Sequence, residues 1–192
     1  MKNNQETTET VSECAKLLIE LELTLGFAES ATCGYIAYAF SLVEGAGQFL
    51  KGGIFCYDAS IKESLLKVDK KLIDQYTPES AAVTKAITEG LAPLLNCDIS
   101  IGCTGLTCPG GSETAKKPVG TMFLHATHAH KTVFASRTVF SGNQQEIVAS
   151  ATHQAAQQLL FYLRHLKDQR QKTLANNQDS SGEIDEWSVS WP

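Results

Sequence analysis

TLGFAESATCGYIAYAFSL, residues 24–42, predicts a strand, a turn and a helix in direct succession. Residues 24–28 form a short apolar run of the kind that lies in a buried strand. Residues 34–42 have the length and composition of a helix, so residues 29–33 must form the turn between the two elements. A buried strand that passes through a tight turn into a helix is typical of an α/β fold, and its turn is a common place for functional side chains.

The elements expected on either side of this unit extend the same pattern. The expected helices span residues 6–21, residues 61–66, a stretch that starts at Thr77-Pro78-Glu79 and runs to about residue 95, and residues 144–167. Further strands are expected at residues 52–57, 98–103, 119–128 and 133–139, the last two joined by a turn around Ala129. Strands that alternate with helices, followed by a hairpin and a helix, predict a three-layer α/β/α sandwich on a mixed, mostly parallel sheet.

Length and composition set the domain organisation. The chain has 192 residues, 43% of them apolar, which suits one globular domain over residues 1–169. Residues 170–192 form a polar tail that contains both tryptophans, Trp187 and Trp191. We expect these two aromatic side chains to dock in a groove of the same or a neighbouring subunit, and we expect a homo-oligomer.

Charge and hydropathy exclude several classes of partner. Sixteen Lys and Arg against 21 Asp and Glu give a net charge of −5, which disfavours nucleic acid. No apolar run approaches the ~20 residues of a membrane span, and the first residues, MKNNQETTET, lack the apolar segment of a signal peptide. These features predict a cytoplasmic protein with no nucleic-acid or membrane partner.

The cysteines and histidines predict no metal site. The six cysteines form no CxxC pair and several lie in apolar runs, as reduced, buried thiols do. Among the clustered histidines, His128 and His130 would share one face of a strand while His125 lies on the other. A common metal centre is therefore disfavoured.

Three segments combine small, hydroxyl and basic residues at expected strand ends: AESATCG at 28–34, GGIFCYDASIK at 52–62, and TGLTCPGG at 104–111 with KPVGT at 117–121. In order and spacing they resemble the CinA C-terminal domain family, whose typical motifs are AESCTGG, GG…AYSN…K and TGIAGPGG…KPVGT. The resemblance runs from about Leu17 to Leu163. Because no separate amino-terminal domain of the long CinA type is expected before it, the chain resembles the stand-alone form.

The resemblance implies a nicotinamide-mononucleotide deamidase, which hydrolyses the carboxamide of that small-molecule nucleotide by a serine-lysine mechanism without metal or organic cofactor. Carried over by motif, Ser30 is the nucleophile, Lys62 the general base and Tyr57 a hydrogen-bonding helper. The chemistry is consistent, because a serine hydroxyl needs a base and a lysine can be that base once burial lowers its pKa. The expected substrate-binding residues are Thr32, Gly34, Thr104, Gly105, Gly110 and Gly111. The glycines among residues 104–111 would let backbone N–H groups approach a phosphate.

Other interpretations remain open, both for the single residues and for the function of the whole chain. Taken alone, Ser30 fits a helix N-cap, Lys62 a solvated surface lysine and Tyr57 a half-buried strand aromatic. The motifs also depart from the family pattern at Ala31, Cys33, Asp58, Ala59, Thr107, Cys108, Asn143, Gln144 and Val148. Since Gln144 and Val148 stand where the family has phosphate-clamping arginines, a catalytically degenerate paralogue that binds a ligand or a protein is the main alternative. A related amide or nucleotide substrate is the third possibility.

Overall fold

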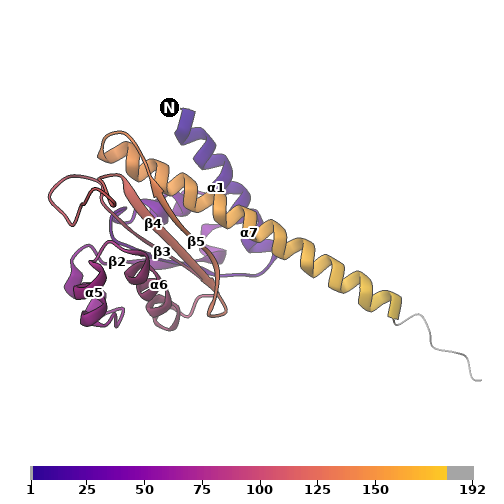
Figure 1. The fold of residues 1–192 in the computed structure, drawn as a ribbon. Helices are drawn as coiled ribbons and strands as arrows, with labels where there is room; N and C mark the ends of the chain where they lie inside the picture. The colour runs from indigo at the N-terminus through magenta and orange to yellow at the C-terminus, as the bar shows by residue number, and fades with distance from the viewer. Residues whose placement is uncertain (1, 181–192) are drawn as a thin grey trace, which may run out of the picture.

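The computed structural model describes the backbone of residues 2–180 and the side chains of residues 5–176. Its centre is one sheet of five strands in the order β2-β1-β3-β4-β5 (Figure 1). The strands are β1 (Leu25–Glu29), β2 (Leu50–Phe55), β3 (Ile99–Gly105), β4 (Thr121–His128) and β5 (Lys131–Val139). β1 pairs in parallel with β2 and β3, whereas β4 is antiparallel to both β3 and β5. Four strands therefore run in one direction and β4 runs against them.

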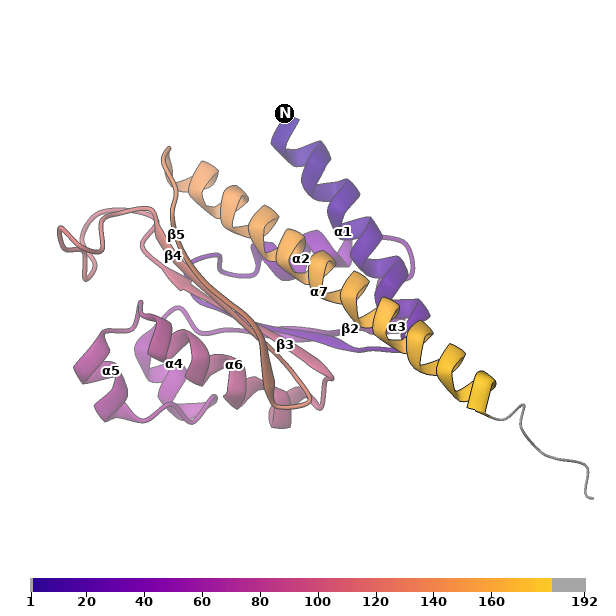
Figure 2. The ribbon, with the colours of Figure 1, turned by 45° about the vertical axis from the view of Figure 1, so that its right-hand side comes forward.

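Helices cover both faces of the sheet, which confirms the three-layer α/β/α sandwich (Figure 2). One layer holds α1 (Lys2–Glu20), α2 (Tyr35–Ser41), α3 (Ala46–Phe49) and α7 (Gln144–Ser180). The other holds α4 (Ala59–Ser64), α5 (Lys70–Tyr76) and α6 (Ala81–Leu95). Each face has its own apolar core, the larger around Leu18, Phe27 and Leu159 and the smaller around Leu66, Ile87 and Leu91. Burial on both faces explains why β1 is buried along its whole length.

The strand-turn-helix unit at residues 24–42 is confirmed within one residue at each boundary. The prediction that a helix starts at Thr77 is wrong. Thr77 instead ends α5, with a left-handed φ of 69°, and α6 begins after Ser80, whose side chain accepts a hydrogen bond from the Val83 N–H. Two short helices, α3 and α5, were not expected, because each buries a single side chain, Phe49 and Ile73, and so shows no apolar period.

The last helix is also longer than expected. α7 continues past residue 167 to Ser180 through a polar stretch rich in good helix formers such as Lys, Arg, Gln and Ala, with its side chains exposed from residue 168 to residue 176. Residues 170–180 of the expected tail are therefore helical (Figure 1). Trp187 and Trp191, with the expectation that they dock, lie outside the described residues.

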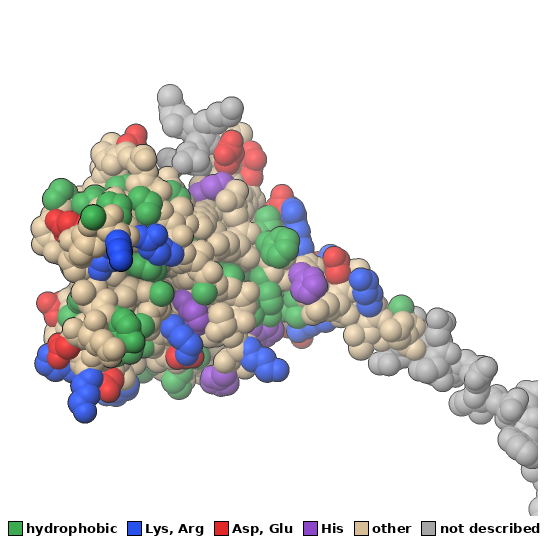
Figure 3. Space-filling model, in the orientation of Figure 1, with side chains coloured by type: hydrophobic (Ala, Val, Ile, Leu, Met, Phe, Trp, Pro, Cys, Tyr) green, Lys and Arg blue, Asp and Glu red, His purple; other side chains and the backbone are tan. Residues whose placement is uncertain are grey.

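The arrangement of β1, β2 and β3 brings the candidate motifs together. Because these three strands are parallel, their carboxyl ends lie at the same edge of the sheet, where Glu29 is in register with both Phe55 and Cys103. The motif segments that begin at residues 28, 52 and 104 leave the sheet from that edge. The surface view shows acidic and basic side chains interspersed over one face (Figure 3). Within residues 2–180, no helix has the length and hydropathy needed to cross a bilayer.

Candidate active site

Ser30 and Lys62 lie in contact at this edge. Ser30 directly follows β1 and Lys62 lies on α4, which begins after the Asp58 N-cap. The Lys62 Nζ is 3.0 Å from the Ser30 Oγ. Ser30 is 6% exposed and Lys62 has no exposed surface, so the interpretation of Lys62 as a solvated surface lysine is wrong.

The surroundings of Lys62 favour its neutral form. Besides Ser30, its Nζ contacts only backbone carbonyls among the described residues, Cys56 O at 2.5 Å and Tyr57 O at 3.3 Å. Burial lowers the pKa of Lys62, and the negative charges of Glu79 and Asp58 oppose that shift only in part. A neutral amine has two N–H groups and one lone pair. With the two N–H groups on the carbonyls, the lone pair faces the Ser30 hydroxyl and can accept its proton.

A buried carboxylate fixes the turn that carries Ser30. Glu29 is fully buried, and its two oxygens accept hydrogen bonds from the Thr32 hydroxyl at 2.6 Å, the Gly34 N–H at 2.9 Å and the Ala37 N–H at 2.8 Å. The carboxylate thereby satisfies the first N–H groups of α2, which no side chain caps from the usual position. Sequence analysis missed this role. The available signal was an acidic residue placed between a buried strand and a helix start.

The Ser30 backbone is held from the other side of β1. Its N–H donates to the carbonyl of Cys103 in β3 at 2.9 Å. That N–H is therefore not available to an oxyanion. The Ala31 N–H has no acceptor within the described part of the chain, and Ala31 lines the pocket, so this N–H is the candidate oxyanion donor next to the nucleophile.

A pocket of about 240 Å³ opens over Ser30. Its lining combines the Ser30 turn, the segment after β2, the start of α6 and the glycine loop after β3: Ser30, Ala31, Tyr57, Glu79, Gly105, Leu106, Thr107, Cys108, Pro109, Gly110 and Gly111. Tyr57 is 63% exposed, which differs from a half-buried strand aromatic. Its backbone carbonyl contacts Lys62, whereas within the described residues its hydroxyl makes no hydrogen bond to Lys62 or Ser30.

The structure divides the six expected substrate-binding residues into two groups. Gly105, Gly110 and Gly111 line the pocket. The other three have partners inside the protein. Thr32 and Gly34 bond Glu29, while the fully buried Thr104 has its hydroxyl 2.8 Å from that of Thr84.

Besides Ala31 and Thr107 in its lining, two more positions that depart from the family pattern lie at this pocket. Gln144, the first residue of α7, donates from Nε2 to the Thr107 hydroxyl at 3.2 Å. Cys108 is exposed and lines the pocket itself. A third, Cys33, is exposed in the turn after Ser30 with a left-handed φ of 46°, a conformation that a glycine adopts at lower cost.

A network outside the expected set anchors the glycine loop. Lys117 Nζ donates to the Thr77 hydroxyl at 2.6 Å, the Ser112 hydroxyl at 2.7 Å and the Glu79 carbonyl at 3.0 Å. The Ser112 hydroxyl donates to the Glu79 carboxylate at 2.5 Å. The Gly110 N–H donates to Glu113 at 2.8 Å. Sequence analysis placed Glu79 only at the start of a helix and gave Glu113 no role, because neither residue lies in a motif of the family.

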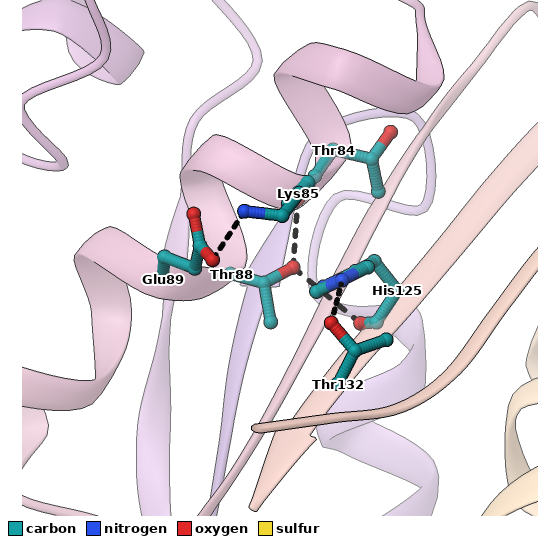
Figure 4. Close-up of polar contacts among 6 residues, drawn as sticks. All are labelled: Thr84, Lys85, Thr88, Glu89, His125 and Thr132. Atoms are coloured by element: carbon teal, nitrogen blue, oxygen red, sulfur yellow. Dashed lines mark hydrogen bonds and ion pairs between the residues drawn. The ribbon is translucent and has the colours of Figure 1, made fainter. Parts of the chain in front are cut away.

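The clustered histidines take part in separate structural contacts. His125 points toward α6, with Nε2 3.1 Å from the Thr132 hydroxyl, beside a Thr88 that also bonds along its own helix (Figure 4). His128 instead has Nδ1 2.6 Å from the hydroxyl of Tyr162 on α7. Among the described residues, no three His, Cys, Asp or Glu side chains are placed to hold one metal ion. All six cysteines are free thiols, and burial raises the pKa of Cys14 and Cys103 to about 12.

Known proteins are similar to this chain in sequence and in fold. Residues 7–163 match the model of the CinA C-terminal domain. The chain is 36% identical over 120 residues to a CinA-like protein of Leptospira borgpetersenii, covering 62% of this chain and 28% of that protein. It is 33% identical over 153 residues to a CinA-like protein of Syntrophotalea carbinolica, covering 79% of this chain and 36% of that protein. The chain thus spans about a third of the length of these curated relatives or less.

Solved structures agree with this relationship. A CinA superfamily protein from Klebsiella pneumoniae superposes with a TM-score of 0.79 at 26% identity, over 83% of this chain and 98% of that one. A second, from Enterobacter cloacae, gives 0.77 at 28% identity, over 82% and 92%. Since the family model covers most of the chain and the folds agree, this protein belongs to the CinA C-terminal domain family.

Proposed function

We propose that the protein is a serine-lysine amidase that converts nicotinamide mononucleotide to nicotinic acid mononucleotide and ammonia. The observation that carries the proposal is the fully buried Lys62 amine 3.0 Å from the Ser30 hydroxyl, with only backbone carbonyls as its other acceptors. None of the ion pairs within the described residues includes Lys62. A lysine kept for folding alone would be expected to reach solvent or a carboxylate.

In the first half of the reaction, the neutral Lys62 takes the Ser30 proton while Oγ attacks the carboxamide carbon. The carbonyl oxygen becomes an oxyanion, toward which the Ala31 N–H can donate. The protonated Lys62 then gives its proton to the amide nitrogen. The carbon-nitrogen bond breaks, ammonia leaves, and an ester of Ser30 remains.

In the second half, water attacks this ester. Lys62, neutral again, accepts the proton of the water and then returns it to Ser30 Oγ as the ester bond breaks. The products are the carboxylic acid and the free enzyme. The sum is one amide and one water converted to one acid and one ammonia, so the cycle needs no metal or organic cofactor. In this proposal the enzyme works in the cytoplasm as a homo-oligomer, a location that suits its six free thiols.

The direct test is ammonia release from nicotinamide mononucleotide by the purified protein and by its Ser30→Ala variant. We expect Ser30→Ala to lose at least about 10³-fold in kcat while its thermal unfolding is unchanged. Ser64→Ala is the matched control, because Ser64 is an exposed serine at the end of the same helix as Lys62. Turnover of Ser30→Ala within about threefold of wild type would exclude Ser30 as the nucleophile.

The same experiment addresses the ligand-binding alternative, which the glutamine at position 144 favours. Nicotinamide mononucleotide that binds wild type in a calorimetric titration, without ammonia release, would support a catalytically inactive binding protein. Ammonia release that depends on Ser30 would exclude it.

A further inference from the structure

The pocket has an acidic side chain and no basic side chain in its lining, which is unusual for a site that binds a nucleotide. Among the residues that line it, Glu79 is the one with an Asp, Glu, Lys, Arg or His side chain. Glu79 is half-buried, and its Oε2 accepts the Ser112 hydroxyl. Its Oε1 accepts no hydrogen bond from the described residues, so this oxygen is available to a ligand. The wall of the pocket thus presents a carboxylate.

The two nearby lysines offer no free donor to an anion. An ammonium group has three N–H donors. Those of Lys117 are used by Thr77, Ser112 and the Glu79 carbonyl, and Lys117 itself is not part of the lining. Lys62 lies below the pocket with its Nζ on Ser30 and two carbonyls. A phosphate would have to break one of these sets of contacts to gain a cation.

The glycine loop, the expected phosphate cradle, is occupied by the protein's own carboxylate. Glu113 accepts the Gly110 N–H at 2.8 Å. This hydrogen bond is the largest cause that lowers the pKa of the Glu113 carboxyl, and the Gly111 N–H adds to the effect. Gly110 has a φ of 100°, as in the turns whose successive N–H groups bind anions. Glu113 therefore takes the place that a phosphate would have.

From these three observations we infer that the pocket selects a positively charged carboxamide through Glu79 and gives its phosphate no counter-charge. The substrate class is the cationic carbamoylpyridinium nucleoside, with the 5′-phosphate dispensable. The inference rests on the proposed amidase function. A carboxylate beside a cationic ring adds Coulomb attraction in a half-buried site, where screening by water is reduced.

The test compares kcat/KM for ammonia release from nicotinamide mononucleotide, from its dephosphorylated nucleoside, and from the reduced nucleoside, whose dihydropyridine ring is uncharged. For wild type we expect the nucleoside to equal or exceed the nucleotide within about threefold, and the reduced nucleoside to be at least about tenfold poorer. Because Glu79 also acts on the pKa of Lys62 and so on every substrate, the measure is a ratio: Glu79→Gln should raise KM for both cationic substrates about tenfold or more relative to KM for the reduced nucleoside. Glu89→Gln is a control, since Glu89 is an exposed acid on the same helix that pairs with Lys85.

A second variant tests the missing counter-charge. Gln144→Arg places a guanidinium where Gln144 now reaches Thr107 at the pocket. We expect it to raise kcat/KM for the nucleotide about tenfold relative to the nucleoside, because an arginine fork pairs with phosphate. Gln171→Arg adds the same charge to an exposed position far along α7 and should change neither value.

The outcomes separate the two proposals. Ammonia release with a nucleotide preference above about tenfold, unaffected by Glu79→Gln, would overturn this inference and leave the amidase intact. If none of the three compounds releases ammonia, the amidase proposal fails, and calorimetric titration of wild type then decides the inference. Tighter binding of the nucleotide than of the nucleoside would overturn it, and the reverse order, lost in Glu79→Gln, would support it.

Discussion

At the scale of single residues, Lys62 is a lysine whose burial among backbone carbonyls suits it to act as a general base. The side chain is fully buried, and its nitrogen faces two carbonyls and one hydroxyl. None of these groups is an anion that would stabilise an ammonium, so burial dominates and lowers the pKa. At neutral pH a larger fraction of an amine in this position is unprotonated than of a surface lysine, so more of it is available to accept a proton.

The expected consequence is a pH-dependent rate that disappears with the amine. In wild type, kcat/KM for ammonia release should rise with pH as Lys62 loses its proton, with a midpoint below the ordinary lysine value of about 10.5. Lys62→Met keeps the length and removes the amine, so it should lose at least about 10³-fold in kcat. Its stability should be equal or higher, since an apolar group then fills a buried site.

Lys71→Arg, a change at an exposed lysine, is the control for activity and folding. A Lys62→Met variant that keeps more than about a tenth of wild-type turnover, or a rate that does not vary with pH, would contradict a role for Lys62 as the base.

The motifs alone pointed to Ser30 and Lys62, but not to their burial or to their neighbours. Serine and lysine are common surface residues, and 32 positions of sequence separate these two. The 3.0 Å distance exists only in the folded chain, where α4 carries Lys62 to the carboxyl end of β1. Glu79 and Glu113 escaped prediction for the same reason, because their importance depends on the turn geometry of the glycine loop and not on any local pattern.

At the scale of elements, the turn between β1 and α2 requires a buried charged group to be fully hydrogen-bonded. It leaves a fully buried carboxylate, Glu29, in place of the usual side-chain cap, with the N–H groups of Gly34 and Ala37 as donors. Such hydrogen bonds to a charged group are stronger than neutral ones. The whole Ser30 turn therefore depends on one acidic residue.

Glu29→Gln tests that dependence. A carboxamide has one acceptor oxygen in place of two, and its NH₂ group would face N–H donors. We expect the free energy of unfolding to fall by about 2–4 kcal/mol, and kcat to fall because Ser30 shifts relative to Lys62. Denaturant titration and ammonia release measure the two effects.

Glu13→Gln provides the comparison, because Glu13 is an exposed acid that pairs with Arg164 on the surface. Its loss should cost less than about 1 kcal/mol. Equal effects of the two substitutions on stability would show that the Glu29 carboxylate does not hold the turn.

Prediction of the elements succeeded where burial gave a long or regular signal. All five strands and the long helices are apolar enough on their inner faces to show it, whereas α3 and α5 each bury a single side chain. The start of α6 was misplaced because Thr77-Pro78-Glu79 has the composition of a cap. Ser80 takes that role once Thr77 is used to end α5.

At the scale of the whole molecule, the sheet separates two cores that differ in character. The layer with α1 and α7 is largely apolar. The layer with α6 also holds a polar group between helix and sheet: Thr84, Thr88 and His125 (Figure 4). His125 is 4% exposed, and its Nδ1 has no hydrogen-bond partner among the described residues. This core tolerates a neutral imidazole and resists an imidazolium, because burial outweighs the attraction of Glu89, whose charge is paired with Lys85.

The stability of the fold should therefore fall in mild acid. Burial lowers the pKa of His125 in the folded protein, whereas in the unfolded chain it returns to about 6.5. Below that pH the unfolded state binds a proton that the folded state does not, so the free energy of unfolding decreases as pH falls, by at most about 1.4 kcal/mol per pH unit for this group.

Denaturant titrations from pH 7.5 to 5 measure the slope, and His125→Gln removes one titrating group while an amide keeps a polar contact to Thr132. We expect the variant to be less stable than wild type at pH 7.5 and to lose less stability on acidification. Parallel curves for the two proteins would show that His125 takes up its proton in the folded state as readily as in the unfolded chain, and that the core beneath α6 is open to water.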